Sequence, residues 1–108
     1  MKFKDTLWDS ENRRHVLSEG DEHPERTLFE EDVDEVVRET KHPLRKMDKY
    51  ESEGEPRVDM LGKTAHDRIL FVTVAPKVGG MARPVGARDA TEQEVRSYDG
   101  WLKSRRKR

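Results

Sequence analysis

Cysteine is absent from this chain of 108 residues. Without thiols the protein can form neither disulfide bonds nor a thiolate zinc site, which excludes the small secreted scaffolds that disulfides stabilise. Long apolar runs are also missing. No segment approaches the roughly 18 apolar residues of a membrane span, and the N-terminus lacks an apolar run of signal-peptide length. We therefore expect a cytoplasmic protein that neither spans a membrane nor is exported by that route.

Apolar side chains are few as well: hydrophobic residues make up 31% of the chain and charged residues 42%. This composition lies near the limit at which apolar burial can offset the conformational entropy lost on folding. The length predicts one domain, which we place at residues 1–102, followed by a basic, disordered tail at residues 103–108. Because the core must be thin, a partner subunit would stabilise it, and we expect a homo- or hetero-oligomer.

Charge is unevenly distributed although the formal net charge is only -1. Residues 19–39 contain ten acidic residues and two arginines, whereas residues 81–108 contain eight basic and four acidic residues. A bound phosphate should therefore contact the C-terminal part of the chain. The acidic block is most simply explained as a solvated helix face.

The spacing of apolar residues predicts an α+β fold in the order strand, helix, helix, four strands and helix. The expected strands cover residues 3–8, 44–50, 57–62, 68–75 and 81–88, and the expected helices cover residues 9–17, 28–37 and 91–102. In such a fold the helices should pack on one face of a mainly antiparallel sheet.

Capping residues mark the helix ends. Asp9 is a good N-cap for the first helix, and Gly20 supplies a stop. Thr91 and Glu94 have the spacing of a capping box for the last helix. In the middle helix, apolar residues from Leu28 to Val37 recur at helical spacing between acidic residues, which predicts one apolar stripe.

Glycine and proline mark the strand ends. Residues 68–75 are rich in β-branched side chains and should form the central strand, with Pro76 ending it and Gly79-Gly80 forming the next turn. Residues 53–56 should form an earlier turn. Pro84 cannot donate to a β-ladder, so its strand must lie at an edge or carry a bulge.

Three groups of residues resemble the BrnT family of ribonuclease toxins from bacterial toxin–antitoxin pairs. The matching positions are Trp8, Asp9, Asn12 and His15; Gly62, Thr64, Arg68, Leu70 and Val72; and Ala87, Arg88, Asp89, Ala90, Thr91, Glu94 and Tyr98. The resemblance spans residues 7–98, and its closing block is the most specific part. Two departures are Glu19, where a second histidine is usual, and Pro84, which interrupts a strand.

The resemblance implies a RelE-like fold, cleavage of RNA that stops translation, and a cognate ribbon-helix-helix antitoxin as partner. Cleavage of this kind uses the RNA 2′-hydroxyl as nucleophile, so the protein must accept its proton, neutralise the phosphate and protonate the leaving oxygen. We expect Arg88 first and Arg83 second to bind phosphate, because a guanidinium can contact two phosphate oxygens. An ion pair of Arg88 with Asp89 or Glu94 is an equally good interpretation.

Each of the other candidate residues has a structural alternative. Lys63 and Arg68 are further nucleic-acid-binding candidates, or ordinary solvated strand-end residues. Tyr98 could donate a proton or stack on a base, although its place on an apolar stripe favours the core. Glu94 could act as general base, although the capping box already explains it. His15 could act as an acid–base group, or simply pack its helix against the sheet.

No metal or cofactor is expected, because the remaining histidines, His23, His42 and His66, match no metal-site spacing. The leading hypothesis is an endoribonuclease toxin with RNA and an antitoxin as partners. A second hypothesis is a non-catalytic BrnT-like module that binds a protein or nucleic acid, which the near-neutral charge favours. A third is a structural subunit whose acidic helix, residues 29–37, packs on a basic partner.

Overall fold

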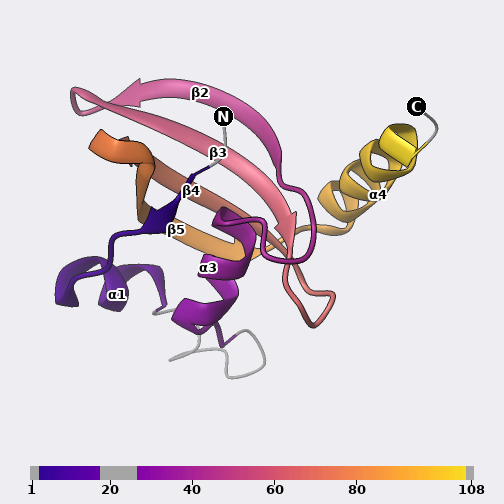
Figure 1. The fold of residues 1–108 in the computed structure, drawn as a ribbon, viewed down its shortest axis with the longest axis horizontal. Coiled ribbons are helices and arrows are strands. Elements are labelled where there is room, and N and C mark those ends of the chain that lie inside the picture. The colour runs from indigo at the N-terminus through magenta and orange to yellow at the C-terminus, as the bar shows by residue number, and fades with distance from the viewer. Residues whose placement is uncertain (1–2, 18–26, 107–108) are drawn as a thin grey trace.

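A computed structural model describes residues 3–17 and 27–106 and has an α+β fold (Figure 1). The strands are β1 (Asp5–Thr6), β2 (Arg45–Ser52), β3 (Glu55–Lys63), β4 (Ile69–Lys77) and β5 (Met81–Asp89). The helices are α1 (Ser10–Val16), α3 (Glu30–Val37) and α4 (Glu92–Arg106), with a short 3-10 turn, η2 (Val78–Gly80). The predicted α+β class and element order are confirmed.

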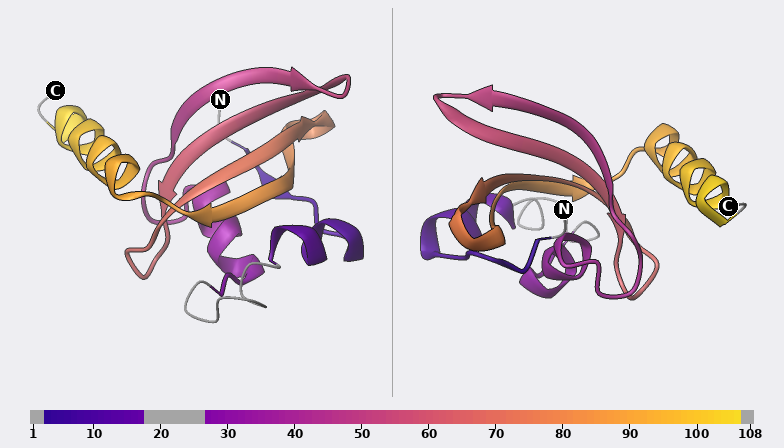
Figure 2. Two further views of the ribbon diagram at one scale, coloured as in Figure 1. Left: turned by 180° about the vertical axis from the view of Figure 1, so that it is seen from behind. Right: turned by 45° about the horizontal axis from the view of Figure 1, so that its top comes forward.

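One five-stranded sheet organises the molecule, in the order β1-β5-β4-β3-β2. Neighbouring strands from β2 to β5 are antiparallel, as expected, whereas β1 pairs parallel with β5 through Asp5 and Met81. The sheet is therefore mixed. Turning the molecule shows α1 and α3 on one side of the sheet and α4 leaving from one end (Figure 2).

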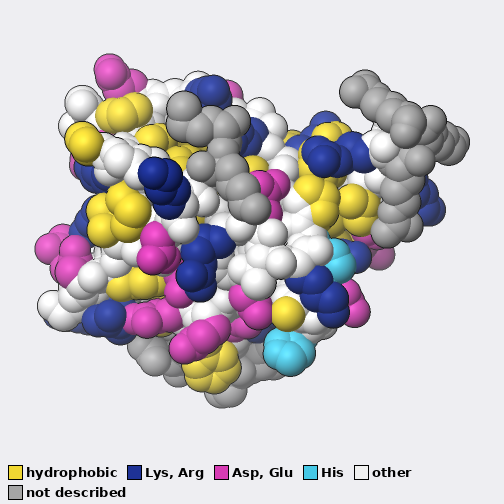
Figure 3. Space-filling model, in the orientation of Figure 1, with side chains coloured by type: hydrophobic (Ala, Val, Ile, Leu, Met, Phe, Trp, Pro, Cys, Tyr) yellow, Lys and Arg dark blue, Asp and Glu magenta, His cyan; other side chains and the backbone are white. Residues whose placement is uncertain are grey.

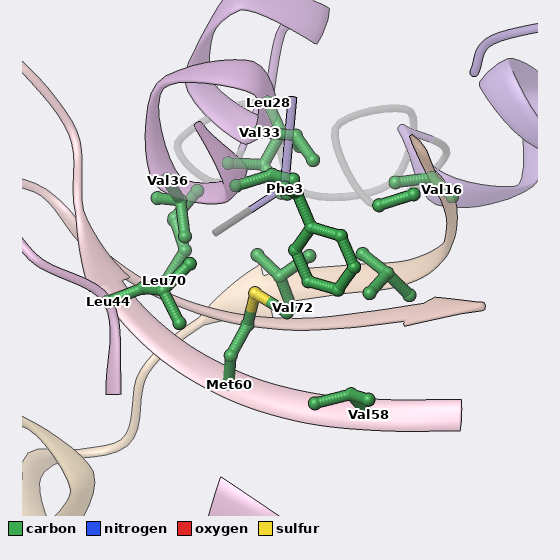
Figure 4. Packing of buried hydrophobic residues seen from close by; sticks show 13 residues of the cluster. Phe3, Val16, Leu28, Val33, Val36, Leu44, Val58, Met60, Leu70 and Val72 are labelled. Atoms are coloured by element: carbon green, nitrogen blue, oxygen red, sulfur yellow. The ribbon is translucent and has the colours of Figure 1, made fainter. Parts of the chain in front are cut away.

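The apolar core lies between α3 and the sheet. Met60 of β3 and Val72 of β4 are fully buried there and face Val33 of α3 (Figure 4). Because side chains alternate along a strand, their sequence neighbours Asp59, Leu61, Phe71 and Thr73 project from the opposite side. We call these two sides the helical side and the polar side.

The last helix corrects the expectation that all helices cover one face. Arg45 pairs with Leu61 and therefore projects from the polar side, where its Nη1 donates to the carbonyl oxygen and to Oγ of Ser97 at 3.0 and 2.7 Å. Tyr98 is fully buried at this contact. Beyond it α4 extends past the sheet (Figures 1 and 2), since its apolar stripe is too short to hold the whole helix down.

The boundary of the expected tail is also corrected, because α4 continues to Arg106 and so includes residues 103–106. Residues 107–108 lie outside the described part of the chain, as does the predicted stop at Gly20. Phe29 was expected on the apolar stripe but is the N-cap residue of α3 and is 60% exposed. None of the described helices is both long and apolar enough to cross a membrane.

The strand ends differ from prediction at several points, and β1 covers only Asp5–Thr6 of the expected residues 3–8. The turn between β2 and β3 shortens to Glu53 and Gly54, both with positive φ. Pro76 lies within β4 rather than ending it, opposite Ala82. The pairing of β4 with β3 already ends at Val74, so Pro76 sits where the strand is paired on one side only, and proline is tolerated there.

Of the two alternatives predicted for the strand that contains Pro84, an edge position or a bulge, the structure shows the bulge. Thr73 pairs with Gly86 and Val74 pairs with Pro84, so Val85 is the extra residue in β5. The carbonyl oxygen of Pro84 accepts a hydrogen bond from the amide of Asn12 at 3.2 Å. The bulge thereby gives α1 an anchor on β5.

Candidate nucleic-acid interface

Arg83 and Arg88 project from the same polar side of β5. Arg88 pairs with Phe71 and Arg83 with Ala75, and both partners are odd-numbered residues of β4, which share one side. The two arginines are nevertheless four β4 residues apart, or about 13 Å. They lie at different ends of the polar side, so the two arginines expected to bind phosphate do not converge on one phosphodiester.

Arg88 forms a two-pronged ion pair with Glu94. Its Nη1 and Nη2 donate to the two carboxylate oxygens at 2.7 and 3.1 Å, and its guanidinium lies 4.3 Å from the centre of the Phe71 ring. The hydrogen bond from Arg88, more than any other contact, lowers the pKa of Glu94. Glu94 also completes the capping box with Thr91. The ion-pair alternative for Arg88 is confirmed, and Glu94 is held ionised.

Arg68 also has a structural partner. It lies on the helical side, where Nε and Nη2 donate to Asp89 at 2.5 and 2.8 Å and Nη1 donates to the carbonyl oxygen of Thr27 at 2.6 Å. Lys63 is half-buried on the polar side opposite Ile69, near α4. These two residues therefore do not share a surface, and Arg68 is not on the polar side with the other candidates.

Tyr98 is packed into the molecule. Its side chain is fully buried, its hydroxyl donates to the carbonyl oxygen of Pro43 at 2.6 Å, and burial raises its pKa to about 12. A tyrosine that holds its proton this strongly and faces the protein interior is a poor acid for a substrate. The core interpretation of Tyr98 fits these contacts, and we leave Tyr98 and Glu94 out of the candidate site.

A cleft of about 620 Å³ lies at the other end of the polar side, between α1, β5 and the β2–β3 hairpin. Its lining residues are Glu11, Asn12, Arg14, His15, Glu53, Arg57, Arg83 and Val85. Two of the predicted site residues, His15 and Arg83, are brought together here. Arg14 and Arg57 were missed, although the spacing of Glu11, Arg14 and His15 places these three on one face of α1.

The cleft is weakly cationic. Three arginines and two glutamates line it, which leaves one excess positive charge before any protonation of His15. Nη2 of Arg83 lies 3.3 Å from Oδ2 of Asp9, whose pKa is lowered mainly by the backbone N–H of Asn12 and further by Arg83. Among the described residues, this is the hydrogen bond that the Arg83 side chain forms, and Arg83 also lowers the pKa of Glu55 through its charge.

One nitrogen of the Arg57 side chain lacks a hydrogen-bond partner in the described part of the chain. Its Nε is buried and has no hydrogen-bond partner among the described residues, the nearest carboxylate being Glu55 at 3.6 Å. Buried donors in folded proteins almost always have a partner, including water or a ligand. Arg57 therefore has hydrogen-bonding capacity that no described residue uses, and its side chain lines the cleft.

A second polar group that the sequence reasoning missed lies beside Arg57. The hydroxyls of Tyr50 and Thr73 both donate to Oδ1 of Asp59, at 3.0 and 2.7 Å. Burial is the largest cause that raises the pKa of Tyr50, and the hydrogen bond to Asp59 is the second. The alternation of Arg57 and Asp59 with apolar Val58 and Met60 in the expected third strand was the signal that could have identified this side.

Among the described residues, no group of three or more His, Asp or Glu side chains is arranged to hold a metal ion. No protein-family model, curated protein or solved structure matches this chain. The resemblance to BrnT proteins therefore rests on the sequence motifs alone.

Proposed function

We propose that the protein is an endoribonuclease of the BrnT-like toxin class, with a RelE-like fold, that holds the scissile phosphodiester in the cleft between α1, β5 and the β2–β3 hairpin. The observation that carries the proposal is the meeting of His15 with Arg14, Arg57 and Arg83 around one cleft. Guanidinium groups bind phosphate, and an imidazole can exchange a proton with the reacting oxygens.

Arg57 and Arg83 are suited to share one phosphate. They project from the polar side of β3 and β5, the strands that flank β4, so their backbones lie two strand spacings apart, or about 10 Å. Two arginine side chains can span that separation. Together they would neutralise the charge that develops on the pentavalent phosphate.

Cleavage would proceed by attack of the 2′-oxygen on phosphorus. The new P–O2′ bond gives a cyclic phosphate as the P–O5′ bond breaks, the 2′-hydroxyl proton passes to His15, and the 5′-oxygen takes a proton from water as it leaves. No metal or cofactor enters these steps. RNA rather than DNA is the expected substrate, because only RNA carries the nucleophile.

The test is cleavage of single-stranded RNA by the purified protein in the presence of a chelator. We expect His15→Ala to lower the rate about 10²–10⁴-fold and Arg57→Ala or Arg83→Ala to lower it about 10²–10³-fold. Arg38→Ala is the matched control, because Arg38 lies at the end of α3, away from the cleft. DNA of the same sequence should stay intact. Intact RNA at high concentrations of folded protein would contradict the proposal.

A second candidate is a BrnT-like module that binds RNA or protein without cleavage. It is favoured by the ion pairs of Arg83 and Arg88 with Asp9 and Glu94, and by the net charge of -1. Growth on expression separates the two functions, since a toxin arrests cells whereas a binding module does not.

The partner proposed for a toxin is a ribbon-helix-helix antitoxin that covers the polar side. An adjacent reading frame encoding such a protein, which forms a stable complex on co-expression and restores growth, would support the toxin. A complex that leaves RNA cleavage unchanged would contradict inhibition at this surface.

A further inference from the structure

The outer half of α4 carries an aromatic and cationic surface that the cleft does not use. Trp101 is half-buried, with its ring centre 5.6 Å from that of Tyr98, and the guanidinium of exposed Arg105 lies 4.9 Å from the Trp101 ring. Hydrophobic and basic side chains lie next to one another where α4 leaves the sheet (Figure 3). This part of the helix extends beyond the strands (Figure 1).

The helix places this surface in line with the polar side of the sheet. Glu94, Trp101 and Arg105 are separated by seven and four residues, so they lie on one face of α4. Glu94 contacts Arg88, which stacks on Phe71. The line therefore runs from Arg83 in the cleft over the Phe71–Arg88 pair to the Trp101–Arg105 pair.

The length of this line suits an extended strand of several nucleotides. Four residues of β4 separate Phe71 from Ala75, or about 13 Å, and eleven residues of α4 separate Glu94 from Arg105, or about 16 Å. Along it an arginine stacks on an aromatic ring twice. Proteins bind single strands with aromatic rings that stack on bases and cations that follow the phosphates.

We propose that this line is a track for single-stranded RNA and that Trp101 and Arg105 of α4 bind the part of the substrate that extends beyond the cleft. The proposal deepens the proposed function by naming an extended single strand as its substrate and α4 as a second contact. Stacking leaves the N–H edge of the Arg105 guanidinium available for a phosphate. The charge of Glu94 on the track is offset by Arg88.

The experiment measures binding of fluorescently labelled 2′-O-methyl oligouridylates of four and twelve nucleotides, which cannot be cleaved because the nucleophile is blocked. We expect Trp101→Leu to weaken binding of the twelve-nucleotide strand at least about fivefold. We expect Arg105→Ala to weaken it and to reduce the slope of log affinity against log salt by about 0.7. Both variants should bind the four-nucleotide strand like the natural protein.

Lys103→Ala is the matched control. It removes one exposed cation from the same turn of α4, but Lys103 points away from Trp101 and Arg105 on the helical wheel. Thermal unfolding checks that Trp101→Leu is folded, and Arg105→Ala tests the track without removing a packed ring.

Three results would overturn the track. They are unchanged binding of the long strand by both variants, equal affinity for the short and long strands, and an equal loss with Lys103→Ala. The cleavage proposal fails separately: if Arg83→Ala abolishes cleavage while Arg105→Ala changes nothing, the enzyme stands and the track does not. If the track variants weaken binding but RNA stays intact, the track stands without the enzyme.

Discussion

Arg83 and Arg88 both lie on β5, but the carboxylates with which they form ion pairs, Asp9 and Glu94, hold them differently. Arg88 places two N–H groups on both oxygens of Glu94 and stacks on Phe71. Among the described residues, Arg83 forms one longer hydrogen bond, of 3.3 Å, with Asp9. A bidentate, stacked guanidinium orders the structure around it, whereas a singly contacted one can turn toward a ligand. The two residues should therefore respond differently to substitution.

We expect Arg88→Ala to lower the free energy of unfolding by about 0.5–1 kcal/mol, the range for partly exposed ion pairs. Arg83→Ala should change it by less than about 0.5 kcal/mol and should instead reduce RNA cleavage. Urea unfolding and cleavage rates measured on the same preparations distinguish the two effects. A stable but inactive Arg88→Ala variant would restore Arg88 as the principal phosphate ligand.

The buried hydroxyl of Tyr98 predicts a loss of stability in alkali. Its pKa is raised to about 12 in the folded protein, above the usual value of 10.0, so the unfolded chain loses the proton first. The contribution of the Tyr98 hydroxyl to the free energy of unfolding is fully present below pH 10 and is lost as the pH rises toward 12. Tyr98→Phe should flatten this part of the stability curve and cost about 1 kcal/mol at pH 7 through the lost hydrogen bond. An unchanged alkaline curve in Tyr98→Phe would contradict the assignment.

At the scale of elements, the contacts of α1 and α3 with the sheet decide where the cleft lies. Asn12 is buried and its amide donates to the carbonyl oxygens of Leu7 and Pro84, which holds α1 against the bulge in β5. The face of α1 that carries Arg14 and His15 is thereby turned to the cleft. On the helical side, α3 approaches β3 closely at Gly62, where an added Cβ would press against the side chain of Val36.

Gly62→Ala should destabilise the protein by about 1–3 kcal/mol, the usual cost of overpacking. A Cβ at residue 62 would lie 2.5 Å from Cγ1 of Val36, and a β-branched side chain in a helix has little freedom to move aside. Gly86→Ala is the control in the same sheet, since a Cβ there meets nothing within 4 Å. Thermal unfolding compares the two, and the double variant Gly62→Ala with Val36→Ala should recover part of the loss.

At the scale of the whole molecule, one sheet separates the apolar helical side from the polar side. The helical side holds the apolar core, whereas the polar side carries its ion pairs at both ends: Asp9 with Arg83 at the cleft, and Glu94 with Arg88 at α4. Lys77 lowers the pKa of Glu55 in the same way across the β3–β4 pair. The three carboxylates, Asp9, Glu55 and Glu94, come from different parts of the fold, and all three have a lowered pKa.

Stability should therefore fall in acid. The pKa values of Asp9, Glu55 and Glu94 are lowered in the folded protein from 3.8, 4.5 and 4.5, so their contribution is present above these values and is lost as the pH falls below them. Urea midpoints at pH 7, about pH 4.5 and about pH 3 would show the decline. Glu94→Gln should make it shallower, and an equally steep decline in that variant would contradict the role of Glu94.

Local sequence patterns determined most of the elements. The caps at Asp9 and Thr91 and the central apolar strand follow from short-range chemistry and were correctly predicted, and the bulge at Pro84 was one of the two alternatives predicted for its strand. Capping boxes need side-chain and backbone groups only three residues apart. A missing proline N–H constrains the ladder wherever the strand lies.

Only the tertiary structure decided which side chains meet. Arg57 and Arg83 are neighbours because β3 and β5 flank β4, and His15 joins them because Asn12 anchors α1 on the bulge, contacts that span 26 to 72 residues of sequence. The same folding turned α4 to the polar side, whereas the ion pair of Arg88 with Glu94 joins residues close in sequence and was already one of the predicted alternatives. Sequence spacing fixes the side of a strand on which a residue projects, but strand order and helix docking depend on long-range packing, which no local pattern encodes.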